Sequence, residues 1–319
     1  MEIYKTESQI AAKHNWLLSL VVLLLITFGV LALTQGIALV LIPFLFDVPY
    51  DDILPLFEGQ LDHPNGRIAL LFLQGLGGGL AFLLAGYIFS RVVEKASLAW
   101  EQQFNRVKFS SLALIFPLLF GFILFDSIIV DWNMNIELPS FMQGFENYAR
   151  AMEDKAMAMT KYLTDFNGFG EFMVGLLVIG IFAGIGEEYF FRGVIQAKMH
   201  RYTGNAHWGI WISAFIFSAI HFQFYGFFPR MFLGALFGYL YLFSGSLIYP
   251  MAGHVLNNSF TLVMVYLNKL GIVEFSIEEA DDFSWFAVVV GLLVFIVCIR
   301  LFISQNRNIS SHGKVAEGI

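Results

Sequence analysis

The chain has 319 residues, of which 58% are hydrophobic and only 13% are charged, and its mean hydropathy is +0.70. Soluble domains carry about 25% charged residues, so this composition excludes a disordered chain, a disulfide-stapled scaffold and a nucleic-acid-binding protein. It predicts an all-α protein, a bundle of membrane-spanning helices, because lipid offers no partner to an unpaired backbone amide. The net charge of −7 arises from acidic residues that gather in a few loops.

Eight apolar runs along the chain predict about eight transmembrane helices. The first run is about twice as long as the apolar core of a cleavable signal peptide, so we expect it to be retained. The sixth run is short, and we expect it to cross only as part of the bundle. The runs are Trp16–Phe46, Arg67–Val93, Phe109–Val130, Phe172–Phe191, Ala206–Phe224, Met231–Phe243, Leu247–Leu267 and Trp285–Ile303.

Basic residues between the runs predict the orientation of the chain, because Lys and Arg concentrate in cytoplasmic segments. The basic segments contain Arg91, Lys95, Arg106 and Lys108, then Arg192, Lys198 and Arg201, and in the tail Arg300, Arg307 and Lys314. Alternate loops are acidic and contain Asp47, Asp51, Asp52, Glu58 and Asp62, then Glu274, Glu278, Glu279, Asp281 and Asp282. With eight spans, both termini are expected in the cytoplasm.

The stretch Phe141–Leu163 mixes Met and aromatic residues with polar ones at a spacing that indicates an amphipathic helix. We interpret it as a connector that rests on the membrane surface. A surface helix that contacts substrate is the alternative.

Three glycine pairs have the GxxxG spacing: Gly75–Gly79, Gly180–Gly184 and Gly234–Gly238. The run after Gly75 is not a dinucleotide fingerprint, because Leu80 stands where the third glycine would be and no strand precedes it. Close packing between membrane helices is the interpretation that we favour.

Ionisable groups at membrane depth are costly and therefore mark candidate functional sites. Glu188 and Arg192 lie four residues apart on one helix face, with the acid first, and this spacing favours an ion pair. Glu187 is turned about 100° around the helix and is left free of that pair. A poorly solvated, unpaired carboxylate suits general acid/base chemistry.

Two later segments add polar groups inside apolar runs. Phe217 and His221 share a face of the fifth run, and His254 and Asn258 share a face of the seventh. Asn257 lies on a neighbouring face. A satisfied packing histidine and interhelical hydrogen bonds are the structural alternatives for these residues.

The depth of Glu187, His221 and His254 in the membrane tests whether their side chains can meet. At 1.5 Å per residue, Glu187 lies roughly 10–15 Å from the cytoplasmic end of its span, His254 lies at about the same depth, and His221 lies deeper, at roughly 20 Å. This mismatch requires a tilt, a break or a late start of the fifth helix, and the sequence does not choose among them.

Glu187, His221, His254 and Asn258 together suggest peptide hydrolysis without a covalent intermediate. Glu187 and His221 can orient and deprotonate a water, while His254 and Asn258 can donate to the oxyanion. Glu187, His221 and His254 also form a donor set able to hold Zn²⁺ with one open position, so residue types alone leave both chemistries open. The sequence contains no HExxH or GxSxG motif, and Gly168–Glu171 departs from the GxGD motif at its last residue.

The three motifs, EExxxR at Glu187–Arg192, FxxxH at Phe217–His221 and HxxxN at His254–Asn258, resemble the CAAX protease and bacteriocin-processing family (CPBP, or Abi) over roughly residues 170–265. The resemblance implies that Glu187 activates water with His221, that His254 and Asn258 stabilise the oxyanion, and that Glu188 and Arg192 support them, with Phe217 beside them. The family is often described as metalloproteases. We favour a metal-free glutamate mechanism and keep Zn²⁺ as the alternative cofactor.

The expected function is therefore an intramembrane endopeptidase that acts on a membrane-associated or lipidated peptide or protein. The expected location is the bacterial cytoplasmic membrane, with the lipid bilayer as a partner and no nucleic acid. We divide the chain into N-terminal helices with the connector (1–168), a catalytic core (169–268) and a last helix with its tail (269–319). A non-enzymatic transporter or assembly scaffold that uses the same polar residues is the alternative.

Overall fold

A computed structural model describes residues 16–57, 63–96, 98–275 and 284–311. The described residues form helices and contain no β-strand, which confirms the predicted all-α membrane bundle. Several residues used above for orientation lie outside the described residues: Glu58, Asp62, Glu278, Glu279, Asp281, Asp282 and Lys314.

The N-terminal part of the chain forms three long helical stretches, two of which are interrupted, and the predicted connector. Its elements are α1 (Trp16–Phe46), α2 (Tyr50–Phe57), α3 (Gly66–Gly77), α4 (Gly79–Ile88), η1 (Phe89–Val93), α5 (Trp100–Asn105), α6 (Phe109–Ala113), α7 (Ile115–Met134), η2 (Ser140–Met142) and α8 (Gln143–Thr164). The connector is helical as predicted, because α8 covers almost all of Phe141–Leu163.

The second half begins with one continuous helix that changes its winding along its length. It consists of α9 (Phe169–Gly175), η3 (Leu176–Phe182), α10 (Ala183–Glu188), η4 (Tyr189–Gln196) and α11 (Ala197–Thr203). The remaining elements are α12 (Ala206–Ala219), α13 (Phe227–Ser244), α14 (Ile248–Lys269) and α15 (Trp285–Ser311). The segments η3 and η4 are π-helical, a wider winding that often occurs near functional sites.

Each of the eight predicted runs contains a helix, although the fifth run leaves its helix after Ala219. Six of the described helical stretches are long and apolar enough to cross a membrane by themselves. The other two are α12 and α14. α12 has only 14 residues, about 21 Å of helix against a hydrocarbon thickness of about 30 Å. α14 has 22 residues, but its polar residues lower its hydropathy, so it depends on the bundle around it.

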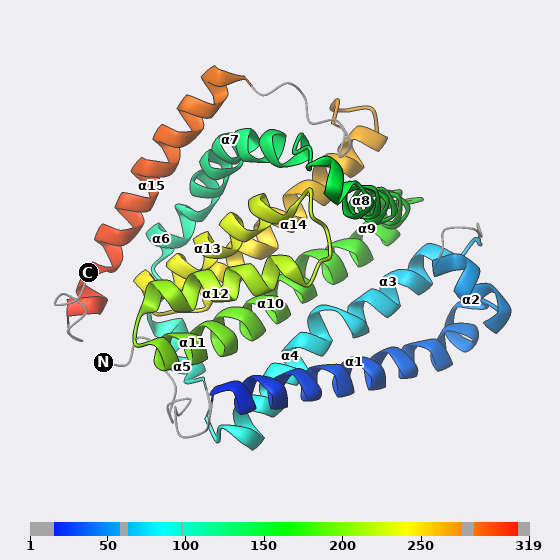
Figure 1. The fold of residues 1–319 in the computed structure, drawn as a ribbon, viewed down its shortest axis with the longest axis horizontal. Coiled ribbons are helices and arrows are strands. Elements are labelled where there is room, and N and C mark those ends of the chain that lie inside the picture. The colour runs from blue at the N-terminus through cyan, green and yellow to red at the C-terminus, as the bar shows by residue number, and fades with distance from the viewer. Residues whose placement is uncertain (1–15, 58–62, 97, 276–283, 312–319) are drawn as a thin grey trace.

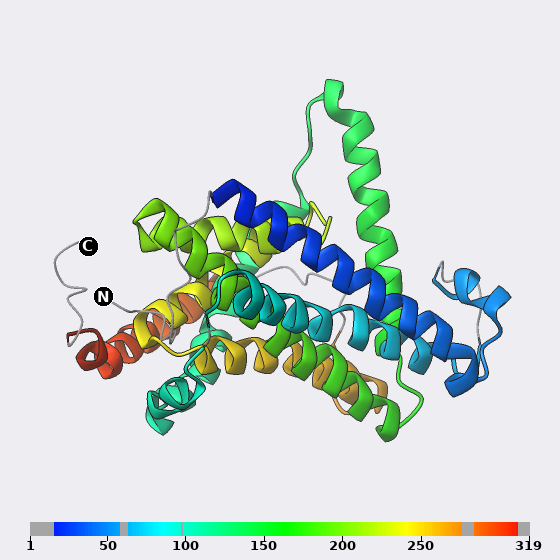
Figure 2. The ribbon, with the colours of Figure 1, turned by 90° about the horizontal axis from the view of Figure 1, so that it is seen from below.

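Most of the long helices run side by side along one direction, and α8 does not. α1 begins and α15 ends at the same end of the bundle (Figure 1), so the two ends of the helical region face the same side. Which side is cytoplasmic stays a prediction. α8 is seen end-on in Figure 1 and stands out from the bundle in Figure 2. It therefore runs across the other helices, as a helix lying along a membrane surface would.

Glycines bring the helices of the bundle into backbone contact, as the GxxxG interpretation predicts. A Cβ atom on Gly79 would lie 2.0 Å from the carbonyl oxygen of Phe182, and one on Gly186 would lie 1.8 Å from the carbonyl oxygen of Gly79. A Cβ on Gly184 would lie 2.8 Å from the amide nitrogen of Val255 on α14. The helix that carries Glu187 is thus clamped between α4 and α14.

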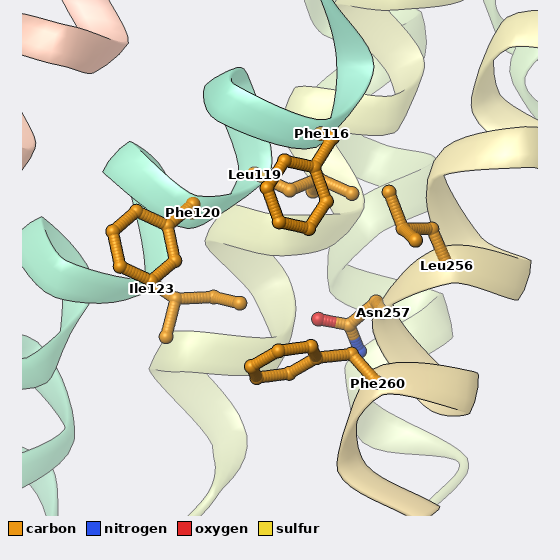
Figure 3. Close-up of a pocket in the computed structure, with 7 residues that line it drawn as sticks. All are labelled: Phe116, Leu119, Phe120, Ile123, Leu256, Asn257 and Phe260. Carbon is orange, nitrogen blue, oxygen red and sulfur yellow. The ribbon is translucent and has the colours of Figure 1, made fainter. Parts of the chain in front are cut away.

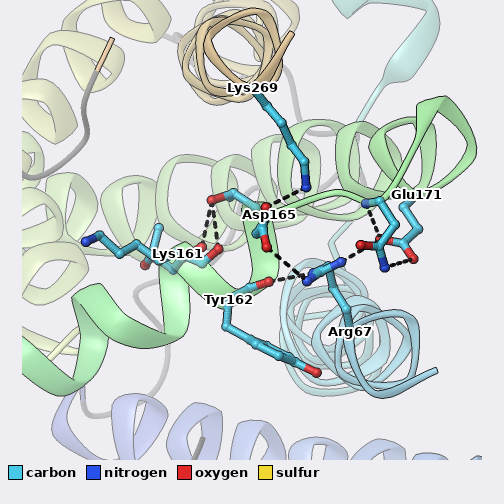
Figure 4. Close-up of polar contacts among 9 residues, drawn as sticks. Arg67, Lys161, Tyr162, Asp165, Glu171 and Lys269 are labelled. Carbon is cyan, nitrogen blue, oxygen red and sulfur yellow. Dashed lines mark hydrogen bonds and ion pairs between the residues drawn. The ribbon is translucent and has the colours of Figure 1, made fainter. Parts of the chain in front are cut away.

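A polar cluster ties four elements together at the end of the bundle opposite the start of α1 (Figure 4). Arg67 on α3 is buried; it donates to the carbonyl oxygen of Tyr162 at 2.7 Å and to the Glu171 carboxylate at 2.9 Å. Asp165 lies 3.5 Å from Arg67 and 2.5 Å from Lys269 of α14. The hydrogen bond from Lys269 holds the pKa of Asp165 below its usual range. The cluster fixes the base of α8 to α3, α9 and α14.

We expect Gly186→Ala to disrupt the bundle, because the added methyl group would overlap the Gly79 backbone, which has no side chain that could move away. Overpacking typically costs about 1–3 kcal/mol, and overlap with a backbone should exceed that range. The measurement is the thermal unfolding midpoint in detergent. Gly29→Ala is the control, since nothing lies within 4 Å of a Cβ there. An equal midpoint for both variants would contradict the proposed close contact.

We expect Arg67→Met to destabilise the protein by up to about 3–5 kcal/mol, the cost of removing one partner of a buried ion pair. The reason is that Glu171 and the Tyr162 carbonyl would lose their donor. Chemical unfolding in mixed micelles measures the change. Arg150→Met is the control: its pair with Glu146 is partly exposed and should contribute no more than about 1 kcal/mol. A similar small loss in both variants would show that the Arg67 cluster does not hold the helices.

Candidate active site

A buried ion pair lies at the centre of the candidate site. Glu188 and Arg192 are both essentially inaccessible, and the Glu188 Oε1 atom accepts a hydrogen bond from Arg192 Nη1 at 2.7 Å. The second guanidinium nitrogen donates to the carbonyl oxygen of Gly234 on α13 at 2.8 Å. The i,i+4 pair predicted from the sequence is therefore formed, and it also ties α10 to α13.

The same carboxylate orients a histidine from another helix. His254 of α14 donates from Nδ1 to Glu188 Oε1 over 2.8 Å; the direction follows because a carboxylate only accepts. This leaves His254 Nε2 directed toward Glu187, whose Oε2 lies 3.8 Å away. That distance exceeds a hydrogen bond. Glu187 is thus close to His254 without being bonded to it, and its side chain keeps 16% exposure.

Aromatic rings fix both histidines. Phe217 packs edge-on against His221 and His254, with ring centroids 5.2 and 5.9 Å away, and it lies beneath the Arg192 guanidinium at 4.8 Å. Phe237 stacks on His254, with ring centroids 5.3 Å apart. Rings in such packed positions leave the imidazoles little rotational freedom.

His221 lies in a turn rather than inside a helix, because α12 ends at Ala219. Its Nδ1–H donates to the carbonyl oxygen of Phe217 at 2.8 Å, which leaves Nε2 able to accept a proton or a hydrogen bond. Phe222, the next residue, has a φ of +55°, and this left-handed conformation turns the chain back toward α13.

The depth mismatch between Glu187 and His221 disappears because the Glu187 helix is longer than its apolar run. It continues to Thr203, so roughly 24 Å of helix lie between Glu187 and its end. His221 lies roughly 22 Å from the start of α12 at Ala206, and these two helix ends are adjacent in the chain. Measured from the end of this helix, Glu187 lies further in than the roughly 10–15 Å expected from the run. The predicted run ended at Phe191 because charged residues follow, but the helix continues and buries Arg192 and Lys198 in ion pairs.

Glu187 and His221 line one cavity of about 270 Å³. The cavity lies between Glu187 and the turn that carries His221 on one side and the N-terminal helices α1, α2, α3 and α4 on the other. Its lining residues are Gln35, Phe57, Leu73, Gln74, Gly77, Gly78, Phe82, Glu187, Ile220 and His221. The candidate acid and one candidate histidine therefore face a shared space that can hold water and part of a substrate.

Asn258 and Asn257 do not line this cavity. Asn258 Nδ2 donates to the carbonyl oxygen of Ile179 in η3 at 3.0 Å, so it links α14 to the π-helical segment. Asn257 points into a small apolar pocket against α7, together with Phe116 and Phe260 (Figure 3). The structure thus brings Glu187, His221 and His254 together and places Asn258 one helical turn away.

Glu187, His221 and His254 were also the expected ligands of an alternative zinc site. Among the described residues, no three His, Cys, Asp or Glu side chains are grouped so that they could hold a metal ion. Glu188 is not available as a further metal ligand, because its carboxylate already binds Arg192 and His254. The described side chains therefore do not fit a zinc site in this arrangement.

Sequence reasoning missed a polar chain that joins α8 to the turn after α12. Glu153 of α8 accepts from Gln223 at 3.0 Å, and Gln223 accepts from Arg230 at 2.9 Å. It also missed Gln35 and Gln74 of the cavity wall. Both glutamines are polar residues inside predicted apolar runs, and this is the sequence signal that marks them.

Comparison with known families identifies part of the chain. Residues 169–260 match the family model of the type II CAAX prenyl endopeptidases, described as Rce1-like. This match covers the segment with all three motifs and confirms the resemblance inferred from them. No curated protein and no solved structure matches the chain.

We expect Glu188→Gln and Glu187→Gln to differ in their effect on stability. The first leaves Arg192 as an uncompensated buried cation, which costs about 3–5 kcal/mol. The second removes a charge that faces the cavity and should change stability by less than about 1 kcal/mol. Thermal unfolding of the two variants in the same detergent measures the difference. Equal destabilisation would contradict the division between a structural and a free carboxylate.

Proposed function

Residues 169–260 form an Rce1-like domain of the CPBP family, and from this premise we propose that the chain is an intramembrane endopeptidase. Its substrate is a membrane-associated peptide, most simply a lipidated one. The observation that carries the proposal is that Glu187, in the helix that runs to Thr203, and His221, in the turn after α12, line one cavity, while a buried ion pair neutralises Glu188.

In the proposed reaction, a water in the cavity is held between Glu187 and the free Nε2 of His221. Glu187 removes one proton as the water oxygen bonds to the carbonyl carbon of the substrate. When the carbon–nitrogen bond breaks, Glu187 returns this proton to the departing amine. The products are a carboxylic acid and an amine, and no covalent enzyme intermediate forms.

His254 is the proposed first donor to the oxyanion. Because Nδ1 already donates its proton to Glu188, this role requires that Nε2 is protonated as well. The His254 imidazole is then a cation, and the carboxylates of Glu187 and Glu188 lie beside it. Asn258 is the proposed second donor. Its amide holds the Ile179 carbonyl in this structure, so we expect that contact to shift when substrate binds.

We further propose that the end of the bundle where α1 begins and α15 ends faces the cytoplasm of a bacterial cell. The support is the basic residues near that end, among them Arg91, Lys95 and Arg201. The glutamate mechanism without metal is likewise our proposal.

The decisive experiment is cleavage of a farnesylated reporter peptide, ending in a CAAX sequence, by purified protein in lipid nanodiscs. We expect Glu187→Ala to lower kcat by about 10²–10⁴-fold, the range of general acid/base catalysis. His254→Ala should lower it by about 10²–10³-fold, the range of an oxyanion donor. Thr34→Val is a control whose hydroxyl binds only its own helix.

Metal content is measured on the same protein, purified without chelator. We expect activity to persist after metal is removed. Zinc bound in a 1:1 ratio and lost together with activity would overturn the metal-free mechanism. Full activity of Glu187→Ala would overturn the whole assignment, and Glu187-dependent transport without cleavage would favour a transporter instead.

A further inference from the structure

The cavity beside Glu187 has two walls of different origin. One wall carries Glu187 and His221 and belongs to the Rce1-like domain. The other wall is built by α1, α2 and the α3–α4 junction, which lie outside the matched residues. Any substrate that reaches Glu187 in this cavity therefore also contacts the N-terminal helices.

Two carboxamides project from this second wall. Gln35 of α1 and Gln74 of α3 both line the cavity, and both residues are exposed. The part of the chain that the structure describes holds no hydrogen-bond partner for either carboxamide. Gln35 lies far inside α1, roughly 28 Å from its first residue, in a helix that is otherwise almost wholly apolar.

Such groups are costly at membrane depth unless they are satisfied. An amide without a partner in an apolar medium costs roughly 2–7 kcal/mol depending on the reference state. Two of them on adjacent helices, both facing the space beside Glu187, indicate that this space supplies their partners. A cavity of this volume has room for water molecules that can serve as those partners.

The substrate has the same need as the carboxamides. An extended peptide at membrane depth must satisfy the backbone amides and carbonyls next to the bond that is cleaved. A glutamine side chain donates from its amide nitrogen and accepts at its oxygen, so one glutamine can satisfy both polar groups of one peptide unit. This pairing depends on backbone and not on side-chain sequence.

Two glycines of the α3–α4 junction set the position of the Gln35 carboxamide on this wall. Gly77 and Gly78 line the cavity and present no side chain. A Cβ on Gly77 would lie 2.7 Å from Gln35 Nε2, so the Gln35 carboxamide rests directly on this glycine. Gly78 separates α3 from α4, and its amide bonds to the Gln74 carbonyl at 2.7 Å.

We propose that Gln35 and Gln74 form a subsite that binds the extended backbone of the substrate polypeptide on the wall opposite Glu187. This inference rests on the proposed function, since it assigns the peptide chain of the substrate to that wall. Loss of either glutamine weakens substrate binding and leaves the chemical step at Glu187 largely intact.

The test measures binding separately from cleavage. The probe is a farnesylated CAAX peptide that carries a photoreactive group beside the scissile bond and cross-links to the protein in nanodiscs. Competition by the unlabelled peptide against this cross-linking gives the affinity of the peptide. We expect Gln35→Leu and Gln74→Leu each to weaken binding about five- to tenfold, the effect of one lost hydrogen bond. KM should rise by the same factor, while kcat changes less than twofold.

Two further variants separate this subsite from a structural role. Thr34→Val removes a polar group one position away that does not line the cavity, and it should bind the probe normally. Gly77→Ala displaces the Gln35 carboxamide without removing it and should weaken binding as Gln35→Leu does. All variants should keep the thermal midpoint of the wild type.

The outcomes of binding and cleavage are distinguishable. Unchanged affinity in both glutamine variants, or no saturable cross-linking to the wild type, overturns the subsite. Cross-linking that both glutamine variants retain, and that is lost only when the isoprenoid is removed from the probe, also overturns the subsite. The wall would then bind the lipid and not the peptide backbone. Normal glutamine-dependent binding without any cleavage supports the subsite and overturns the proposed function.

Discussion

The arrangement of the site depends on one buried carboxylate, Glu188, with two partners. Its Oε1 atom accepts from both Arg192 and His254. An isolated charge at this depth would be prohibitively costly, so the guanidinium must be neutralised where it lies, and it also binds the α13 backbone. Because Glu187 directly precedes Glu188 in the same helix, fixing one acid also fixes the direction of the other.

Glycine is the second condition for this geometry. Three helices can meet at Glu187 only because Gly79, Gly184 and Gly186 have no side chains at their crossings. Since α4 belongs to the N-terminal part and α14 to the Rce1-like domain, these crossings join the two. The cavity wall that faces Glu187 is therefore as much a product of glycine packing as of the residues that line it.

The sequence predicted those features that follow from local spacing or from composition. The Glu188–Arg192 pair follows from an i,i+4 spacing, and the apolar runs predicted the helices. Helix ends were less predictable, because apolarity marks where lipid is contacted and not where a helix stops. The helix through Glu187 continues to Thr203 by burying charges that look like loop residues, among them Lys198, which pairs with Glu94. Gln35 and Asn258 acquire their surroundings only from distant segments.

The turn that carries His221 shows why the domain needs the rest of the chain. Irregular backbone at membrane depth is tolerated only where protein or a cavity satisfies it. Asn133 of α7 does so here: it donates to the carbonyl oxygen of Phe224 and accepts from the amide of Phe228, both at 3.1 Å. Glu153 of α8 holds Gln223 in the same turn. The position of a candidate catalytic histidine is thus set by two helices outside the Rce1-like domain, so the domain and its N-terminal helices form one working unit.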